Sequence, residues 1–405
     1  MKNKSRVLVW SLFDFGNSSY AVIIVAFVFA VYFKNVIASG ENIGDFYWSL
    51  GINISMIITA VLNPVCGAIA DYSSNKKKFL FLFTVLCVVS TSLMYFTGEG
   101  TILFAVILFI LSNIGFQTGL TFYDAFISEI AEPKDYNKVS GYGYAAGYVG
   151  SVISVILVFP LKDNPNILFV ISAVFFLVFS MPLFLFLNEK KRAVENVKIN
   201  YISYGFKKVI STVKNINKFR NLKNFLLAFF FYIDAVNTII FFSGIYASST
   251  LKFTITELAV FFLIVQITAM AGSYLFVLIG DRIGIIKSLN INLIFWTLLT
   301  IAVFVTNDKN SFFVIGGFAG LFLGSTQSLS RTLMTFLTPV EMKTEFFGFY
   351  ALMDKTSTLI GPLTFGLVSW LSGSQKLAVL SVGLFFIVGM FLLKKVNAKE
   401  ILINE

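Results

Sequence analysis

About twelve runs of apolar residues, each long enough to cross a lipid bilayer as a helix, dominate this chain of 405 residues. A helix needs about 20 apolar residues to cross a hydrocarbon core of about 30 Å. Inside lipid every backbone N–H and C=O must be bonded within the protein, so helices are the expected structure for such runs. The expected spans are roughly 7–33, 46–70, 79–97, 101–126, 139–161, 166–187, 224–248, 256–280, 288–306, 311–336, 346–371 and 376–395.

The composition supports a membrane protein. Hydrophobic residues make up 57% of the chain and Phe alone contributes 48, more apolar surface than a soluble domain of this length could bury. The chain has no His, the commonest metal ligand, and both Cys66 and Cys87 lie in apolar runs. The net charge of +10 is spread over short loops and does not indicate nucleic acid. We therefore expect an all-α polytopic membrane protein without cofactor, metal or nucleic-acid partner.

One polar interval divides the chain. Residues 188–223 hold ten Lys or Arg against two acids. We expect residues 1–187 to form an N-terminal six-helix bundle and residues 224–405 a C-terminal one, joined by a basic cytoplasmic linker at 188–223. Six apolar residues of the linker share one helical face, which predicts an amphipathic helix at an anionic lipid surface. They are Ile202, Phe206, Val209, Ile210, Val213 and Ile216.

Lys and Arg are distributed unequally between the two sets of alternating loops. With the N-terminus inside, the cytoplasmic segments hold 24 of them and the opposite loops hold 5. Cytoplasmic loops of membrane proteins carry this excess, so both termini and the linker are expected in the cytoplasm. For a bacterial source, the membrane would be the inner membrane of the cell.

Polar residues recur at matching places in the two halves. This pattern favours a parallel duplication of a six-helix unit. The matching positions are Asp14-x-x-Asn17 with Asp234-x-x-Asn237, Asp71 with Asp281, and Gln117 with Gln327.

Several motifs carry a family resemblance. The segment GAIADYSSNKKK around Asp71 and the looser Gly280-Asp281-Arg282-x-Gly284 resemble the cytoplasmic loop motif of the major facilitator superfamily. Three further segments resemble its vacuole-effluxer-like branch, which includes the fungal autophagy-related vacuolar amino-acid exporter. They are WSLFDFGNSSYA, DAFISEIAEP with VSGYGYAAGYVG, and STQSLSRTLM with EFFGFYALMDKTSTLIGP. Asp124 departs from the Asn expected in most relatives.

The resemblance implies two pseudo-symmetric six-helix bundles around a central cavity and transport by alternating access. It also implies that the first, fourth, seventh and tenth spans line that cavity, and these spans carry polar side chains here. The residues expected to bind solute or couple ions are Asp14, Asn17, Asn113, Gln117, Asp124, Asp234, Asn237, Gln327 and Arg331. For Asn113, Gln117 and Gln327, helix packing is an equal alternative.

Three of these residues suggest a solute class. An ionisable residue at the centre of a membrane helix costs about 2.5–3.5 kcal/mol on insertion, so it is a functional candidate by default. Asp14 and Asp234 could meet an ammonium group, and the fork of Arg331 a carboxylate. The expected solute is therefore a small polar molecule such as an amino acid or another zwitterion. Without His, one of the two aspartates would carry any coupling proton.

Other charged residues have expected structural or gating roles. Asp71 and Asp281 should tie helix ends to basic neighbours and so bias the conformational state. Asp354 and Lys355 should belong to a structural ion pair, for which Arg331 is the expected partner of Asp354.

Two other function classes compete with transport of a polar solute. An intramembrane enzyme would need a nucleophile–base pair or a metal cluster, and no extramembrane segment is long enough for an active site, so no enzyme is expected. A lipid or lysolipid carrier of the same superfamily is the alternative to a polar-solute transporter. A groove open to lipid would favour that alternative.

Overall fold

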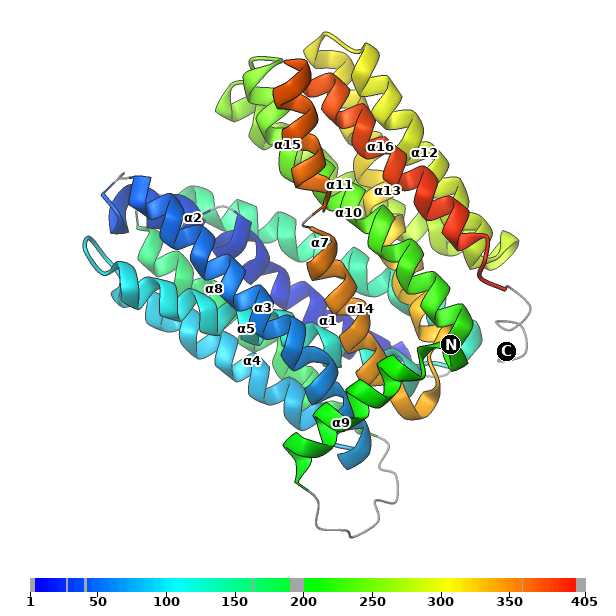
Figure 1. Cartoon of the computed structure of the whole chain (residues 1–405). Coiled ribbons are helices and arrows are strands. Elements are labelled where there is room, and N and C mark those ends of the chain that lie inside the picture. The colour runs from blue at the N-terminus through cyan, green and yellow to red at the C-terminus, as the bar shows by residue number, and fades with distance from the viewer. Residues whose placement is uncertain are drawn as a thin grey trace. The chain divides into compact units, whose positions relative to one another are not determined.

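The structure of the protein is a computed structural model, shown in Figure 1, and it describes residues 4–26, 28–39, 42–161, 164–189, 200–358 and 360–397. Helices make up nearly all of this part of the chain, and no strand occurs in it. The all-α prediction is therefore confirmed. Several predicted linker residues, among them the basic group at 190–192, lie outside the described ranges.

The apolar runs of the first half form helices at the predicted places. The first span is assembled from α1 and α2 and two π-helical segments, η1 (Ala21–Ala26) and η2 (Phe33–Ile37). The helices up to the linker are α1 (Lys4–Tyr20), α2 (Val28–Tyr32), α3 (Asn42–Ser73), α4 (Lys76–Leu93), α5 (Ile102–Ala125), α6 (Ile127–Ile130), α7 (Tyr136–Val158) and α8 (Pro165–Phe186).

The second half shows the same pattern. Its helices are α10 (Arg220–Ser249), α11 (Ile255–Ile283), α12 (Ile285–Val305), α13 (Lys309–Leu337), α14 (Lys343–Ser357), α15 (Ile360–Ser372) and α16 (Gln375–Leu393). Eleven helical stretches of the described chain are long and apolar enough to cross a membrane. The ends of nine of them agree with the predicted spans to about one helical turn, and the other two begin earlier than predicted, at Pro133 and Ile216.

The predicted span 346–371 is the exception, because it is not one helix. Its α14 part ends at Ser357 and its α15 part begins at Ile360. Pro362 lies in the first turn of α15, where the missing N–H of proline is tolerated. The interruption therefore precedes the proline.

The described helices fall into two compact units whose sequences are interleaved. Unit 1 comprises Met1–Glu132, Ala146–Ser211 and Val340–Phe349, and unit 2 comprises Pro133–Ala145, Thr212–Pro339 and Tyr350–Glu405. Helix α7 is therefore divided between the two units after Ala145, and helix α14 after Phe349. The predicted bundles, residues 1–187 and 224–405, are continuous in sequence, and their boundaries stay a prediction.

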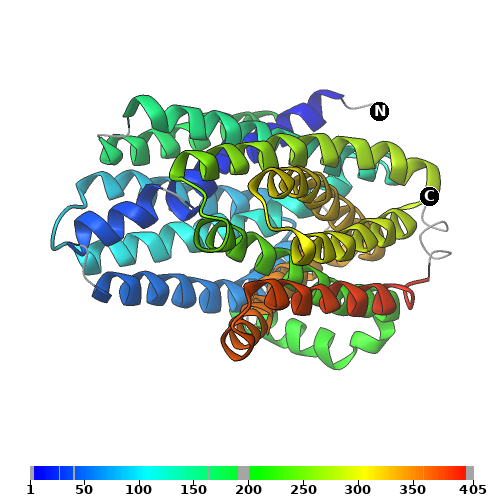
Figure 2. The same ribbon diagram turned by 90° about the horizontal axis from the view of Figure 1, so that it is seen from above.

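Each unit is built from neighbouring helices that pack side by side. In unit 1, α4 packs on α5 and α8, and α3 on α5 (Figure 1 and Figure 2). In unit 2, α11 packs on α13, and α16 on α10 and α12. Glycines allow the α11–α13 approach, since a Cβ at Gly272 or Gly324 would collide with the backbone of the other helix.

The outer surface is apolar. Trp370 is 78% exposed, and Leu363 and Leu103 are 73% and 69% exposed. Water would be a poor solvent for such a surface, whereas the hydrocarbon of a bilayer suits it.

The described part of the linker contains a helix, α9 (Tyr201–Lys214). It packs on α3 through Gly205, where a Cβ would lie only 2.9 Å from Val65 Cγ1. Its apolar residues Ile202 and Phe206 remain 67% and 45% exposed. Binding of this face to lipid stays a prediction.

Candidate functional site

In unit 1 the polar pair of α1 is buried. Asp14 and Asn17 are 8% and 4% exposed, and Asn17 Nδ2 donates a hydrogen bond to Asp14 Oδ1 at 3.3 Å. Ser18 Oγ donates to the Asp14 backbone carbonyl at 2.8 Å. Helix α7 passes close by, because a Cβ built at Gly147 would lie 3.6 Å from Asp14 Cγ. Asp14 therefore sits where α1 meets α7.

The candidates on α5 have different surroundings. Asn113 Nδ2 donates to Ser55 Oγ of α3 at 2.7 Å, which is the bridging role of a packing amide. Gln117 is 9% exposed, and Asp124 is half-buried near the end of the helix. Of the three, Asn113 thus has a clear packing contact.

In unit 2 the matching pair of α10 faces the interrupted helix. Asp234 is completely buried, and its Oδ1 accepts a hydrogen bond from the backbone N–H of Gly361 at 3.0 Å. One helical turn away, Asn237 Nδ2 donates to Asp354 Oδ1 at 3.2 Å. The D-x-x-N pair of α10 therefore bonds to both sides of the interruption, Asp234 to α15 and Asn237 to α14.

The predicted ion pair between Arg331 and Asp354 is wrong. Asp354 Oδ2 instead lies 2.7 Å from Nζ of the adjacent Lys355. The buried guanidinium of Arg331 donates through Nε to Ser140 Oγ at 3.1 Å and through Nη2 to the Ser140 carbonyl at 2.7 Å. It also lies 4.0 Å from the ring centre of Tyr144. The cation that pairs with Asp354 is therefore Lys355, and Arg331 binds α7 at Ser140 instead.

A polar cluster on α12 and α13 was not predicted. Trp296 Nε1 donates to Thr326 Oγ1 at 3.0 Å, and Thr326 Oγ1 donates to Asn292 Oδ1 at 3.3 Å. Gln327 follows this cluster and is half-buried. The signal was available in the sequence, because Asn292 and Trp296 lie one turn apart in an apolar run.

Asp71 holds the first turn of α14. Its carboxylate accepts hydrogen bonds from Thr344 Oγ1 at 2.8 Å and from the Glu345 N–H at 2.9 Å. Lys76 Nζ lies 3.8 Å from Asp71 Oδ1 and 2.6 Å from Glu129 Oε1. The bond from the Glu345 N–H satisfies a backbone donor that the helix itself cannot pair. Asp71 thus acts on a helix N-terminus as well as on a basic neighbour.

Asp281 makes the corresponding contacts with α7. Its Oδ1 accepts a hydrogen bond from Asn137 Nδ2 at 2.9 Å, and its Oδ2 lies 3.3 Å from Lys138 Nζ. Its side chain is 30% exposed, whereas that of Asp71 is 6% exposed. Both motif aspartates therefore contact the start of a helix and a lysine, but only Asp71 accepts a backbone N–H in these bonds, and Asp281 has more access to water.

Burial changes the ionisation of two groups near Asp71 and Lys76. The pKa of Lys343, which precedes the expected 346–371 span, is lowered to about 7, first by desolvation and then by the charge of Lys76. Desolvation also raises the pKa of Glu189, although its carboxylate accepts hydrogen bonds from the Lys76 and Lys77 N–H groups at 2.8 and 3.1 Å. In both cases burial disfavours the charged form.

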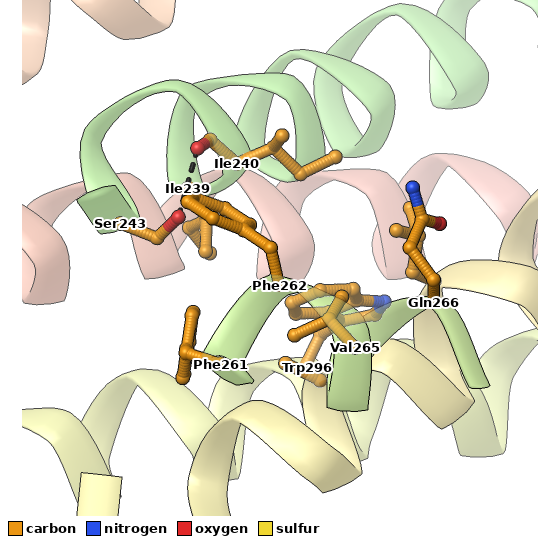
Figure 3. Close-up of a pocket in the computed structure, with 10 residues that line it drawn as sticks. Ile239, Ile240, Ser243, Phe261, Phe262, Val265, Gln266 and Trp296 are labelled. Atoms are coloured by element: carbon orange, nitrogen blue, oxygen red, sulfur yellow. Dashed lines mark hydrogen bonds between the residues drawn. The ribbon is translucent and has the colours of Figure 1, made fainter. Parts of the chain in front are cut away.

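Unit 2 also contains an apolar recess of about 120 Å³. Figure 3 shows its wall, to which α10 contributes Ile240 and Ser243, α11 contributes Phe262 and Gln266, and α12 contributes Trp296. The Ser243 hydroxyl is already bonded to the Ile240 carbonyl at 2.9 Å. Ile240 and Phe262 are 40% and 41% exposed and the wall is mostly apolar, so the recess suits hydrocarbon better than a charged solute.

The chain is similar in sequence to one protein family and to several individual proteins. The profile of the family described as "Vacuole effluxer Atg22 like" matches residues 47–401. The chain is 30% identical over 400 residues to YxiO of Bacillus subtilis (strain 168), described as an uncharacterised MFS-type transporter, covering 95% of this chain and 93% of that protein. It is 25% identical over 272 residues to autophagy-related protein 22 of Kluyveromyces lactis, covering 62% of this chain and 55% of the fungal protein.

Solved structures agree in fold. The human organic anion transporter MFSD10 (TETRAN) superposes with a TM-score of 0.75 at 13% identity, over 97% of this chain and 99% of that one. The proton:xylose symporter XylE superposes with a TM-score of 0.72 at 13% identity, over 97% and 95%. At this identity the likeness establishes the major facilitator fold and leaves the solute open.

Proposed function

Because the chain belongs to the vacuole effluxer Atg22-like family of MFS-type transporters, we propose that it moves a small polar solute across a membrane by alternating access. The proposed solute is an amino acid or a similar zwitterion. The observation that carries the proposal is the burial of ionisable groups in membrane helices, namely Asp14 in unit 1 and Asp234 and Arg331 in unit 2. Each such group costs about 2.5–3.5 kcal/mol on insertion.

The aspartates are the proposed partners of the solute ammonium group. Asp14 has a hydrogen-bond donor in Asn17, and Asp234 has a backbone donor in Gly361. Arg331 is engaged by Ser140 and Tyr144 in this conformation. We therefore assign Arg331 a positioning role toward α7 here, so a solute carboxylate would need another donor. Gln117, Asp124 and Gln327 remain proposed lining residues.

Membrane placement completes the proposal. We place both termini and the linker in the cytoplasm, and in a bacterium the protein in the inner membrane. The proposed partners are the solute, a coupling proton carried by an aspartate, and anionic lipids at α9. Neither a cofactor nor an enzymatic activity is proposed, since the named relatives and neighbours are transporters.

A lipid or lysolipid carrier is the second candidate. The recess of Figure 3 favours it, because its wall is apolar and two of its residues, Ile240 and Phe262, are partly exposed. Its volume of about 120 Å³ accommodates only part of an acyl chain, which is the reason for ranking this candidate second.

Transport by purified protein in proteoliposomes tests both candidates. The uptake of a panel of radiolabelled amino acids should exceed that of protein-free vesicles and should respond to a pH gradient. Fluorescent lysophosphatidylcholine in the same vesicles should not be moved faster than in the protein-free vesicles. Lysolipid movement without amino-acid uptake would overturn the first candidate in favour of the second.

A further inference from the structure

Aromatic side chains enclose the recess of unit 2. Phe261 and Phe262 of α11 and Trp296 of α12 contribute to its wall (Figure 3). Phe262 can approach α10 because Gly244 has no side chain there, and a Cβ at that position would lie 3.3 Å from Phe262 Cζ. Ala319 of α13 also lies in the wall, and its side chain is too short to fill the space. The packing of these helices therefore leaves an aromatic-lined space that no described side chain fills.

The volume of the recess limits the size of an occupant. It measures about 120 Å³, and a smaller void of about 40 Å³ adjoins it, sharing Ile239 and Ser243 in its wall. For comparison, an engineered apolar cavity of about 150 Å³ in another protein binds one benzene molecule. The recess therefore has room for one aromatic ring, whereas it would hold only part of an acyl chain.

Two polar side chains beside this space have unused hydrogen-bonding capacity. Figure 3 shows Gln266 and Ser243 at opposite ends of the recess, and the Gln266 amide makes no hydrogen bond with any described residue. Tyr246 lines the adjoining void and is 2% exposed, and its hydroxyl group has no hydrogen-bond partner among the described residues. A buried polar group without a partner costs free energy, so a ligand that bonds to these groups would be stabilised.

The surroundings of the recess favour a neutral occupant. None of the described residues that line the recess or the void is Asp, Glu, Lys or Arg. A charged ligand would therefore lose its hydration without gaining a counter-ion. Asp234 lies nine residues before Ser243 in α10, which corresponds to about 13 Å along the helix. The recess is thus separate from the aspartates proposed to meet the ammonium group of a zwitterion.

We propose that the recess is a binding site for a neutral phenol. The aromatic ring of the ligand lies against Phe262 and Trp296, since aromatic pairs gain stability from stacked or edge-to-face contacts. Its hydroxyl group bonds to the Gln266 amide, which can both donate and accept a hydrogen bond. A second polar group on the far side of the ring points toward the void at Tyr246. The inference goes beyond the proposed transport of a zwitterion, because neither the site nor the ligand involves the buried aspartates.

Binding of 4-fluorophenol, followed by ¹⁹F NMR on the full-length protein in nanodiscs, tests the site. Protein-free nanodiscs measure the partition of the probe into lipid, and the protein should add a saturable component that unlabelled phenol displaces. Benzoate and benzylammonium, which are charged at neutral pH, should not displace it. Gln266→Leu should weaken binding of 4-fluorophenol about tenfold, the effect of losing one hydrogen bond, and leave binding of fluorobenzene unchanged. Equal losses for the two probes would overturn the assigned hydrogen bond.

Filling the recess supplies the second test. Leu323 of α13 lines the recess and is 8% exposed, so Leu323→Trp should abolish the saturable component. Ala319→Leu adds less volume and should weaken binding at least tenfold, which keeps the test informative if tryptophan prevents folding. Ile267→Trp is the matched control and should leave binding unchanged, because Ile267 is 46% exposed and lies outside the recess.

Three further results would contradict the site itself. They are a signal no larger than that of protein-free nanodiscs, equal binding in the wild type and both filling variants, and displacement by lysophosphatidylcholine but not by phenol. The last result would assign the recess to acyl chains. None of these readouts requires transport, so the amino-acid uptake assay can fail or succeed independently of them.

Discussion

Replacing Asp71 with alanine should free the first turn of α14. The carboxylate accepts two short hydrogen bonds there, from Thr344 Oγ1 and the Glu345 N–H, and its side chain is 6% exposed. Hydrogen bonds to charged groups contribute about 1.5–3 kcal/mol each. With partial compensation by water, we expect a loss of about 2–4 kcal/mol, which is about 30-fold or more in the opening equilibrium of this turn.

Asp281 supplies the matched control. Its side chain is 30% exposed and that of its partner Lys138 is 39% exposed, and ion pairs of this kind contribute about 0–1 kcal/mol. Asn137 Nδ2, which also bonds Asp281, keeps its hydrogen bond to the Val277 carbonyl at 2.9 Å when that carboxylate is removed. Asp281→Ala should therefore change the opening of the α7 start by about fivefold at most. Once a solute is identified, both changes should lower turnover more than apparent affinity, and Asp71→Ala should have the larger effect.

Hydrogen exchange measured by mass spectrometry on the wild type and both variants in nanodiscs provides the assay. Peptides covering residues 343–349 should lose protection in Asp71→Ala, and peptides covering the start of α7 should change little in Asp281→Ala. Equal losses at the two helix starts, or unchanged protection in Asp71→Ala, would refute the argument from burial. A large loss of solute affinity with unchanged turnover would refute the gating role.

Three further predictions concern the cytoplasmic side and the topology. The pKa of Lys343 is lowered to about 7 from 10.5, so the folded protein binds fewer protons than the unfolded chain between these values. Stability should therefore rise with pH across that window, and Lys343→Met should flatten this slope in thermal unfolding scans. A cysteine at Lys309 should react with an impermeant thiol reagent from outside, and one at Lys208 should not; the reverse pattern would overturn the orientation. Gly205→Val should displace α9 from Val65 of α3 and make α9 more sensitive to proteolysis, while unchanged cleavage would contradict the packing.

Most helical spans could be predicted because each one depends on a continuous run of apolar residues. A run of about 20 apolar residues has one low-energy solution in lipid, so the ends of α8, α12 and α16 follow from the sequence to about one turn. The family followed from short motifs such as the one around Asp71, and the profile that matches residues 47–401 confirms it.

Pairing between distant residues depended on the tertiary structure. Apolar composition alone predicted one helix across 346–371, whereas the bond from Gly361 to Asp234, which lies 127 residues earlier, supports an interruption there. The sequence analysis likewise predicted Asp354 as the partner of Arg331, whereas the fold places Ser140 and Tyr144 against the Arg331 guanidinium. Hydrophobicity is a property of each residue in turn, so the sequence by itself determined where helices cross the membrane. Hydrogen bonds and ion pairs need two groups within about 3–4 Å, and only the packed helices decided which groups those are.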